Sequence, residues 1–237
     1  TLSHGPETAL VTYEETAVAN QRVGRSSKLA RVVDTSGYVS TDFHQHTMLG
    51  ADAPVAFRDR VISNAAEDVQ VAVSTEHNVV VDLQPIVEEL GLTKVLVHLP
   101  GDEITTDANR QPWGHANVIP MELDETKPRG GAPSVSGKTA HEVFEEVRKI
   151  ATPHLLQVNH PRAGITGYFD QMGFDPKTGK GTKAGYDPAF DALEVWNGRD
   201  VHAREKVFAD FLALLRTSHP VTATADTDTH GIVGHEP

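Results

Sequence analysis

The chain has 237 residues, of which 38% are hydrophobic and 23% charged, and its formal net charge is −12. This length is sufficient for one large domain with a substantial core. The absence of cysteine excludes disulfides, thiolate catalysis and cysteine-based zinc sites. Because the acidic balance lacks a basic cluster, we expect no nucleic-acid partner, whereas a small anionic substrate is compatible with a locally cationic metal site.

The two ends of the chain do not identify the cellular compartment of the protein. No stretch approaches the roughly 20 apolar residues of a membrane span. The chain begins at Thr1 without an apolar signal segment and ends abruptly at Pro237, so we expect a trimmed or processed chain that is truncated at its C-terminus. A chain without cysteine suits both the cytosol and export. The localisation and the oligomeric state therefore stay unknown.

Two regions follow one another along the chain. Residues 1–38 are polar with short alternating stretches, which predict a β-rich extension. Residues 39–237 form the second predicted region, where apolar runs alternate with segments of helical spacing. The predicted strands cover residues 39–43, 69–73, 94–99, 116–121, 154–158, 192–196 and 221–225. This alternation predicts an α/β fold with a mostly parallel sheet, closed or nearly closed into a barrel.

The predicted helices cover residues 54–68, residues 82–90, a segment that starts at Thr139, and residues 202–215. Pro54 suits the first turn of a helix, and Gly91 suits the left-handed position after one. Thr139 and Glu142 have the spacing of a capping box. Residues 163–187 are rich in Gly, Lys, Asp and Pro, which predicts an irregular insertion such as a lid.

Histidines and carboxylates recur at the predicted strand ends. In parallel α/β folds, functional side chains converge at this edge of the sheet. His44 and His46 are two positions apart, so they point the same way along a strand and could bind one ion. Imidazole and carboxylate ligands without thiolates suit zinc, manganese or iron. The strand-end residues are His44, His46, His77, Glu103, His115, His160, Asp228 and His230.

Seven motifs occur in the order DFHQHT, STEHN, GDEITT, GHAN, NHPR, EVWNG and DTDTH. Together they resemble the PHP (polymerase and histidinol phosphatase) superfamily. The DxHxHT pattern, the DRV sequence at residues 59–61 and the TEHN and GDExTT patterns most resemble CehA/McbA-type metallohydrolases. The resemblance covers about residues 39–232 and implies a distorted (β/α)7 barrel that binds two or three divalent metals.

The resemblance also implies a ligand set. Glu103 would bridge the first and second metals, and Asp52 stands at a position that is His in some relatives and Asp in others. The first metal would also be bound by His44, His46 and Asp228, and the second by His115 and His160. The third metal would be bound by His77, His230 and Asp52. A metallo-β-lactamase would need HxHxDH, which is absent, and a lysine-bridged amidohydrolase would need a lysine where Glu103 stands.

The resemblance favours a phosphoesterase that acts on small phosphate mono- or diesters through a metal-bridging hydroxide. His77 would protonate the leaving group when it binds no metal, and Arg162 would either clamp an anionic substrate group or form a surface ion pair. Carbamate or carboxylic ester hydrolysis is the first alternative, because CehA-type members include such activity. The second is a non-catalytic barrel with structural metals.

Four polar residues near the motifs keep two interpretations each. Asn78, Asn159 and Asn197 either orient ligands through hydrogen bonds or form turns at strand ends. Asp226 precedes Asp228 by two positions and either supports the site or is a turn carboxylate.

Overall fold

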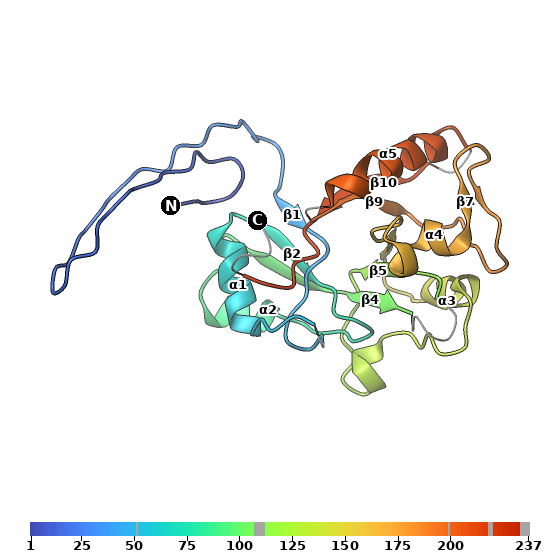
Figure 1. The fold of residues 1–237 in the computed structure, drawn as a ribbon. Helices are drawn as coiled ribbons and strands as arrows, with labels where there is room; N and C mark the ends of the chain where they lie inside the picture. The colour runs from blue at the N-terminus through green and yellow to red at the C-terminus, as the bar shows by residue number, and fades with distance from the viewer. Residues whose placement is uncertain (51, 107–111, 199, 218–219, 233–237) are drawn as a thin grey trace.

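The computed structural model describes residues 1–50, 52–106, 112–198, 200–217 and 220–232 (Figure 1). One sheet is parallel and consists of β1 (Thr41–Asp42), β2 (Val71–Ser74) and β3 (Val97–Pro100) in that order. The other sheet is mixed, and its strands in order are β10 (Thr222–Asp226), β9 (Ala192–Asn197), β6 (Leu155–Val158), β5 (His115–Ile119) and β4 (Asp102–Thr105). The predicted α/β class is confirmed, with β5 antiparallel to both of its neighbours.

The predicted closed barrel is not found among the described residues, where the strands named above form two separate sheets. Between the sheets, only isolated bridges pair Gln45 with Thr229 and His77 with Glu103. Gly101 alone separates β3 from β4, so the chain enters the larger sheet without a crossover helix and the regular βα repeat is broken. We call the zone around these two bridges the seam.

Each sheet has its own helices and core. α1 (Phe57–Ala66) and α2 (Gln84–Glu89) belong with the smaller sheet, whose core is aliphatic. α3 (Ala140–Val147), α4 (Tyr168–Met172) and α5 (Val201–Leu215) belong with the larger sheet, whose core is rich in aromatic rings. A short 3-10 turn, η1 (Pro128–Gly131), lies between β5 and α3. No helix in the described part of the chain combines the length and apolar character needed to cross a membrane.

Local signals placed two helix ends correctly and one wrongly. Thr139 caps α3, because its side chain accepts from the Glu142 amide while the Glu142 side chain accepts from the Thr139 amide. Gly91 follows α2 with a φ of +69°, as its position predicted. The prediction for Pro54 was wrong, since α1 begins at Phe57 and leaves this proline in the preceding loop.

Residues 163–187 are not the irregular lid that their composition predicted. They form η2 (Gly164–Thr166), α4, and a small hairpin of β7 (Phe174–Asp175) and β8 (Lys180–Gly181). Tyr168 and Phe169 are fully buried in the larger core. The apolar side chains of α4, rather than the flanking Gly and Lys residues, decide how this segment packs.

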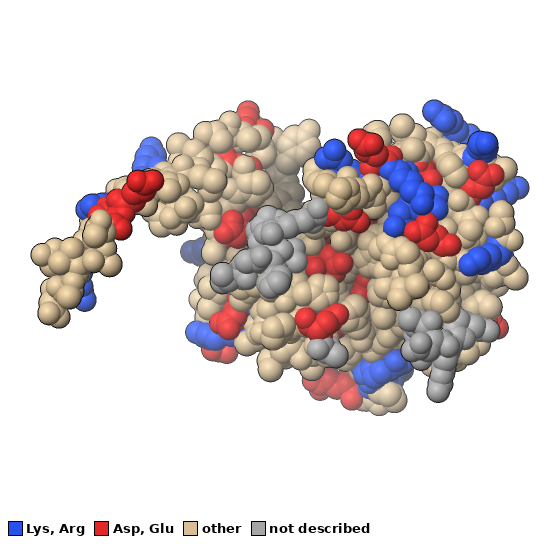
Figure 2. Space-filling view, in the orientation of Figure 1, with Lys and Arg blue, Asp and Glu red and all other residues tan. Residues whose placement is uncertain are grey.

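Residues 1–38 extend away from the rest of the molecule as an arm (Figure 1). The predicted β-rich character reduces to isolated bridges, Leu2 with Val11 and Thr8 with Arg31, without a regular strand. Arg31 ties the base of the arm to Asp68 through an ion pair of 2.8 Å. Basic and acidic side chains are interspersed on the face drawn in Figure 2. The domain boundary at residue 38 stays a prediction.

Candidate metal centre

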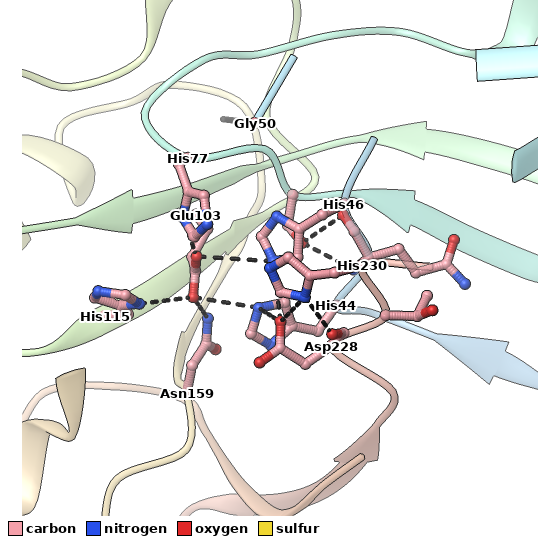
Figure 3. Close-up of polar contacts among 12 residues, drawn as sticks. His44, His46, Gly50, His77, Glu103, His115, Asn159, Asp228 and His230 are labelled. Carbon is pink, nitrogen blue, oxygen red and sulfur yellow. Dashed lines mark hydrogen bonds and ion pairs between the residues drawn. The ribbon is translucent and has the colours of Figure 1, made fainter. Parts of the chain in front are cut away.

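The nine residues that the sequence singled out as metal ligands come together at the seam. Figure 3 labels seven of them, all except Asp52 and His160. The smaller sheet and the loops after β1 and β2 deliver His44, His46, Asp52 and His77. The remaining residues come from the larger sheet and its loops, and they are Glu103, His115, His160, Asp228 and His230. Each half of the centre therefore depends on the other sheet for its partners.

Glu103 lies at the middle of the cluster and is completely buried. Its Oε1 atom lies 3.2 Å from Nε2 of His44, 3.2 Å from Nδ1 of His115 and 3.3 Å from Nε2 of His160. Its Oε2 atom lies 2.6 Å from Nδ1 of His77. Burial raises the pKa of Glu103, but these imidazoles outweigh that effect and hold the pKa well below its ordinary value. The carboxylate is thus ionised and shared among four rings.

Asp228 is the second carboxylate of the cluster. Its Oδ1 atom lies 3.1 Å from Nε2 of His44 and 3.0 Å from Nε2 of His46. Asp228 has a φ of +50°, and His160 has a φ of +24°. Both values lie in the left-handed region that non-glycine residues rarely adopt. Such backbone strain persists where the surrounding structure requires it, most often at functional sites.

The third group lies on the more exposed side of the cluster. The Oδ2 atom of Asp52 lies 3.1 Å from Nε2 of His77 and 3.4 Å from Nε2 of His230. The ring of His46 stacks on both histidines, with centroid distances of 4.5 Å and 4.2 Å. The side chain of Asp52 is 52% exposed, so this group faces the solvent.

Two local features fix the backbone of segments that carry candidate ligands. Gly114 has a φ of +101°, and a Cβ atom there would lie 2.4 Å from the backbone nitrogen of Tyr168, so only glycine lets the chain approach α4 just before His115. Glu76 is buried and accepts hydrogen bonds from the Thr47 hydroxyl and, at 3.0 Å, from the Gly50 amide. This anchors the loop that carries Asp52.

The donor set fits divalent metal ions. Burial lowers the pKa of His44, but Asp228, Glu194 and Glu103 outweigh this effect and raise the pKa well above its ordinary value. Nε2 of His44 is buried without a hydrogen-bond partner, although it lies within 3.2 Å of Glu103 and Asp228. A nitrogen that faces two carboxylates in this way suits coordination of a cation.

Buried charge supports the same conclusion. Among the described residues, six buried carboxyl groups lie in or beside the cluster, against one buried arginine, Arg60. The carboxyl groups are those of Asp42, Glu76, Asp102, Glu103, Glu194 and Asp226. Burial raises the pKa of Asp102 well above its ordinary value and that of Asp226 to about 7. Buried carboxyl groups need partners of opposite charge or hydrogen-bond donors, and bound cations would be such partners here.

Arg162 lies outside the cluster. Its Nε and NH2 groups form a bidentate pair with Asp210, its NH1 group donates to Asp170 at 3.1 Å, and NH2 also donates to the Phe174 carbonyl at 3.2 Å. The guanidinium lies 5.5 Å from the ring centre of Phe169. These contacts occupy the donors that the predicted substrate clamp would need, and they correspond to the ion-pair alternative, although only 7% of the side chain is exposed.

Three polar residues support the ligands directly, and one of them was missed. Asn159 donates to Oε1 of Glu103 at 2.9 Å, and Asn197 donates to Oδ2 of Asp228 at 3.0 Å. Glu194 contacts Nδ1 of His44 at 2.9 Å, and it is not among the residues singled out from the sequence although the EVWNG motif contains it. The signal was available, since EVWNG places a carboxylate in an otherwise apolar strand.

The other strand-end polar residues support the backbone. Asn78 exchanges two hydrogen bonds with the backbone of Thr105, at 2.8 Å and 3.1 Å. Asp226 accepts from the Phe43 amide at 3.1 Å and from Gln157 at 3.0 Å. Both residues therefore fix segments that lead into ligands, without touching the imidazoles through these bonds.

A separate group of three potential ligand residues is an ion-pair network. His141, Glu145 and Asp187 bring ligand atoms within 4.8 Å of one another. Arg148 donates to both carboxylates, at 2.9 Å to Glu145 and 3.1 Å and 3.0 Å to Asp187. The arginine already neutralises these acids, so the grouping is an ion-pair network.

No protein-family model and no curated protein matches the sequence. Solved structures do match in fold. A two-domain protein from Bacteroides vulgatus that contains a predicted PHP-like metal-dependent phosphoesterase is 20% identical with a TM-score of 0.54, over 90% of this chain and 58% of that one. A candidate metal-dependent phosphoesterase from Bifidobacterium adolescentis is 16% identical with a TM-score of 0.51, over 84% of this chain and 90% of that one.

PsfC from Pseudomonas syringae is a third similar structure, 18% identical with a TM-score of 0.52, over 82% of this chain and 78% of that one. At these identities the likeness shows the fold. The resemblance to PHP-like phosphoesterases is therefore confirmed at the level of the fold, and the CehA/McbA resemblance stays a prediction. The chain spans 58% of the length of the Bacteroides protein.

Proposed function

We propose that the chain is a PHP-type metal-dependent hydrolase that cleaves small phosphate mono- or diesters. The observation that carries this proposal is Glu103, a single buried carboxylate in contact with four imidazoles from both sheets. A carboxylate with two oxygens in different ligand groups suits a bridge between neighbouring ions. Two of the solved structures of similar fold are described as metal-dependent phosphoesterases, which supports the same reaction class.

The cluster would hold two or three divalent ions, of zinc, manganese or iron. The ligand groups would be His44, His46 and Asp228; Glu103, His115 and His160; and Asp52, His77 and His230. When bound, the ions would make water a competent nucleophile near neutral pH and offset the negative charge that develops on the substrate.

The side chains on the buried side and on the solvent side of the cluster would have different roles. His44 and His46 are fully buried and exclude water from the inner side. His77 and Asp52 lie on the solvent side, where a small anionic substrate can enter. Where no third ion is held, Glu103 would orient the His77 ring through Nδ1, and Nε2 would donate its proton to the leaving oxygen in place of its contact with Asp52.

A substrate profile tests the reaction class. The purified protein would be assayed with aryl phosphate mono-, di- and triesters beside aryl carboxylic esters and carbamates of the same leaving group. We expect turnover of mono- or diesters. Activity on carbon esters alone would replace this proposal with the carbamate or carboxylic ester hydrolase, and metal binding without any turnover would favour a structural metal centre.

Metal analysis tests the centre itself. Wild-type protein supplemented with zinc or manganese should retain at least two ions per chain after gel filtration, and His44→Ala should lose one or more of them with most of the activity. Substituting Lys for Arg162 should leave the ion content unchanged, because its partners Asp210 and Asp170 lie outside the ligand groups. Wild-type protein that retains no ion would contradict the proposed function.

A further inference from the structure

Glu194 is a buried carboxylate that lies beside the ligand groups but belongs to none of them. Its Oε1 atom lies 2.9 Å from Nδ1 of His44, on the side of the ring opposite to Glu103. Its Oε2 atom accepts hydrogen bonds from the main-chain amide of His160 and, at 3.0 Å, from Nδ2 of Asn197. One side chain thus contacts one ligand through its ring and another through its backbone.

The position of β9 in the larger sheet explains why Glu194 contacts more than one segment of the chain. β9 lies between β6 and β10, so its end is next to the segments that carry His160 and Asp228. Nδ2 of Asn197 bonds both to Glu194 and to Oδ2 of Asp228, each at 3.0 Å. Glu194 is therefore connected to ligands from three separate segments of the chain, two of them in the larger sheet and one in the smaller.

We propose that Glu194 is the positioning residue of the metal centre, an inference that rests on the proposed metal-dependent function. A carboxylate only accepts hydrogen bonds, so the Nδ1 atom of His44 that faces it must carry a proton. The free electron pair for an ion is then on Nε2, which faces Glu103 and Asp228. Fixing a ligand histidine by a carboxylate at its other nitrogen determines its tautomer and increases its basicity.

Glutamine at this position cannot replace both functions. If the amide nitrogen of Glu194→Gln faces His160 and Asn197, it confronts two N–H donors. If it faces His44 instead, Nδ1 must become the acceptor and the proton moves to Nε2, the nitrogen that would bind the ion. The side chain keeps nearly the same shape in both orientations, so the substitution changes hydrogen bonding more than packing.

Zinc affinity measured by competition with a chromophoric chelator provides the test. We expect Glu194→Gln to weaken zinc binding by about 10–100-fold, as loss of such outer partners typically does. The cobalt-loaded variant should also show an altered visible absorption spectrum. Tyr168→Phe is the matched control, because it removes two buried hydrogen bonds to the backbone of Asp187, at 2.9 Å and 2.8 Å, away from the ligands.

The outcomes separate the two proposals. Wild-type protein that binds no zinc overturns the proposed function and this inference with it. Zinc affinity and a cobalt spectrum unchanged by Glu194→Gln, with wild-type binding intact, overturn the inference alone. If Glu194→Gln does not fold, Glu194→Asp takes its place, since it keeps the charge but withdraws the carboxylate from His44. Wild-type affinity in Glu194→Asp would likewise overturn the inference.

Discussion

The larger sheet is packed against aromatic rings, whereas the smaller sheet is packed against short aliphatic side chains. Trp113, Phe144 and Tyr168 are fully buried in the larger core, with ring centres about 6 Å apart as in typical aromatic pairs. The smaller core consists of Val61, Ala72, Leu83, Val87 and Leu96. Because aromatic side chains bury more apolar area, the larger half should be the more stable of the two.

Hydrogen bonds at the seam add to the packing of the smaller half. Arg60 donates to the carbonyls of His46 at 3.1 Å and of Thr229 at 3.0 Å, which joins the two sheets. Gln45 and Asn64 exchange two side-chain hydrogen bonds of 2.9 Å. These bonds surround the ligands, so the part of the molecule with the smaller core depends most on the centre. We therefore expect folding of the larger half to be separable from assembly of the site.

The largest effect should come from the aromatic core. Phe144→Ala should lower the free energy of unfolding by about 3–5 kcal/mol, because it leaves a cavity among buried rings. Denaturant unfolding of metal-loaded protein measures this loss. The retained ions should equal those of the wild type, since Phe144 contacts no ligand ring. Loss of ions in the folded variant would show that the halves are not separable.

Removal of metal should act mainly on the smaller half. Ions at about 1,000 times their dissociation constant stabilise a protein by about 4 kcal/mol per independent site, and a chelator abolishes this contribution. Hydrogen exchange should then accelerate first in β1, β2 and β3, while β6, β9 and α3 keep their protection. Equal acceleration in both halves would contradict the comparison.

A pH-dependent contribution should come from Asp187 in the larger half. Burial raises the pKa of Asp187, but the hydrogen bonds from Arg148 outweigh it and hold the pKa below its ordinary value. A lowered pKa in the folded state stabilises the protein above the unfolded pKa, and this stabilisation is lost as pH falls through the folded value. Asp187→Asn should cost about 1.5–3 kcal/mol at pH 7. The difference from wild type should shrink below about pH 4.

Urea unfolding of both proteins between pH 3 and pH 7 would measure this difference. A constant difference across that range would mean that the charge of Asp187 contributes nothing.

The smallest expected effect concerns a helix end. Thr139→Ala removes the side-chain cap of α3 and should cost about 1 kcal/mol. Thermal unfolding should detect it, and zinc affinity should stay at the wild-type value. Thr139→Ser keeps the hydroxyl and serves as its control. A change in zinc affinity for Thr139→Ala would indicate that strain in α3 reaches the ligands.

The convergence of the candidate ligands other than Asp52 could be predicted from the sequence because each lies beside a predicted strand end with a local motif, whereas Asp52 came from the family resemblance alone. The alternation of strands and helices likewise predicted the α/β class. The direction of β4 could not be predicted, since GDEITT gives no signal of its antiparallel pairing with β5, and this pairing breaks the expected parallel order. Contacts between residues distant in sequence could not be predicted either, such as those of Arg162 with Asp210 and of Glu194 with His44.

The left-handed backbone of Asp228 has a consequence for how this chain can change. Glycine would adopt a φ of +50° without strain, so Asp228→Gly would relieve a backbone cost of about 1–3 kcal/mol while deleting a carboxylate from the centre. Selection for stability alone would favour that replacement, and selection for activity would oppose it. Thermostability screens of this chain should therefore retain an activity assay, because otherwise they would enrich variants that lack the carboxylate at position 228.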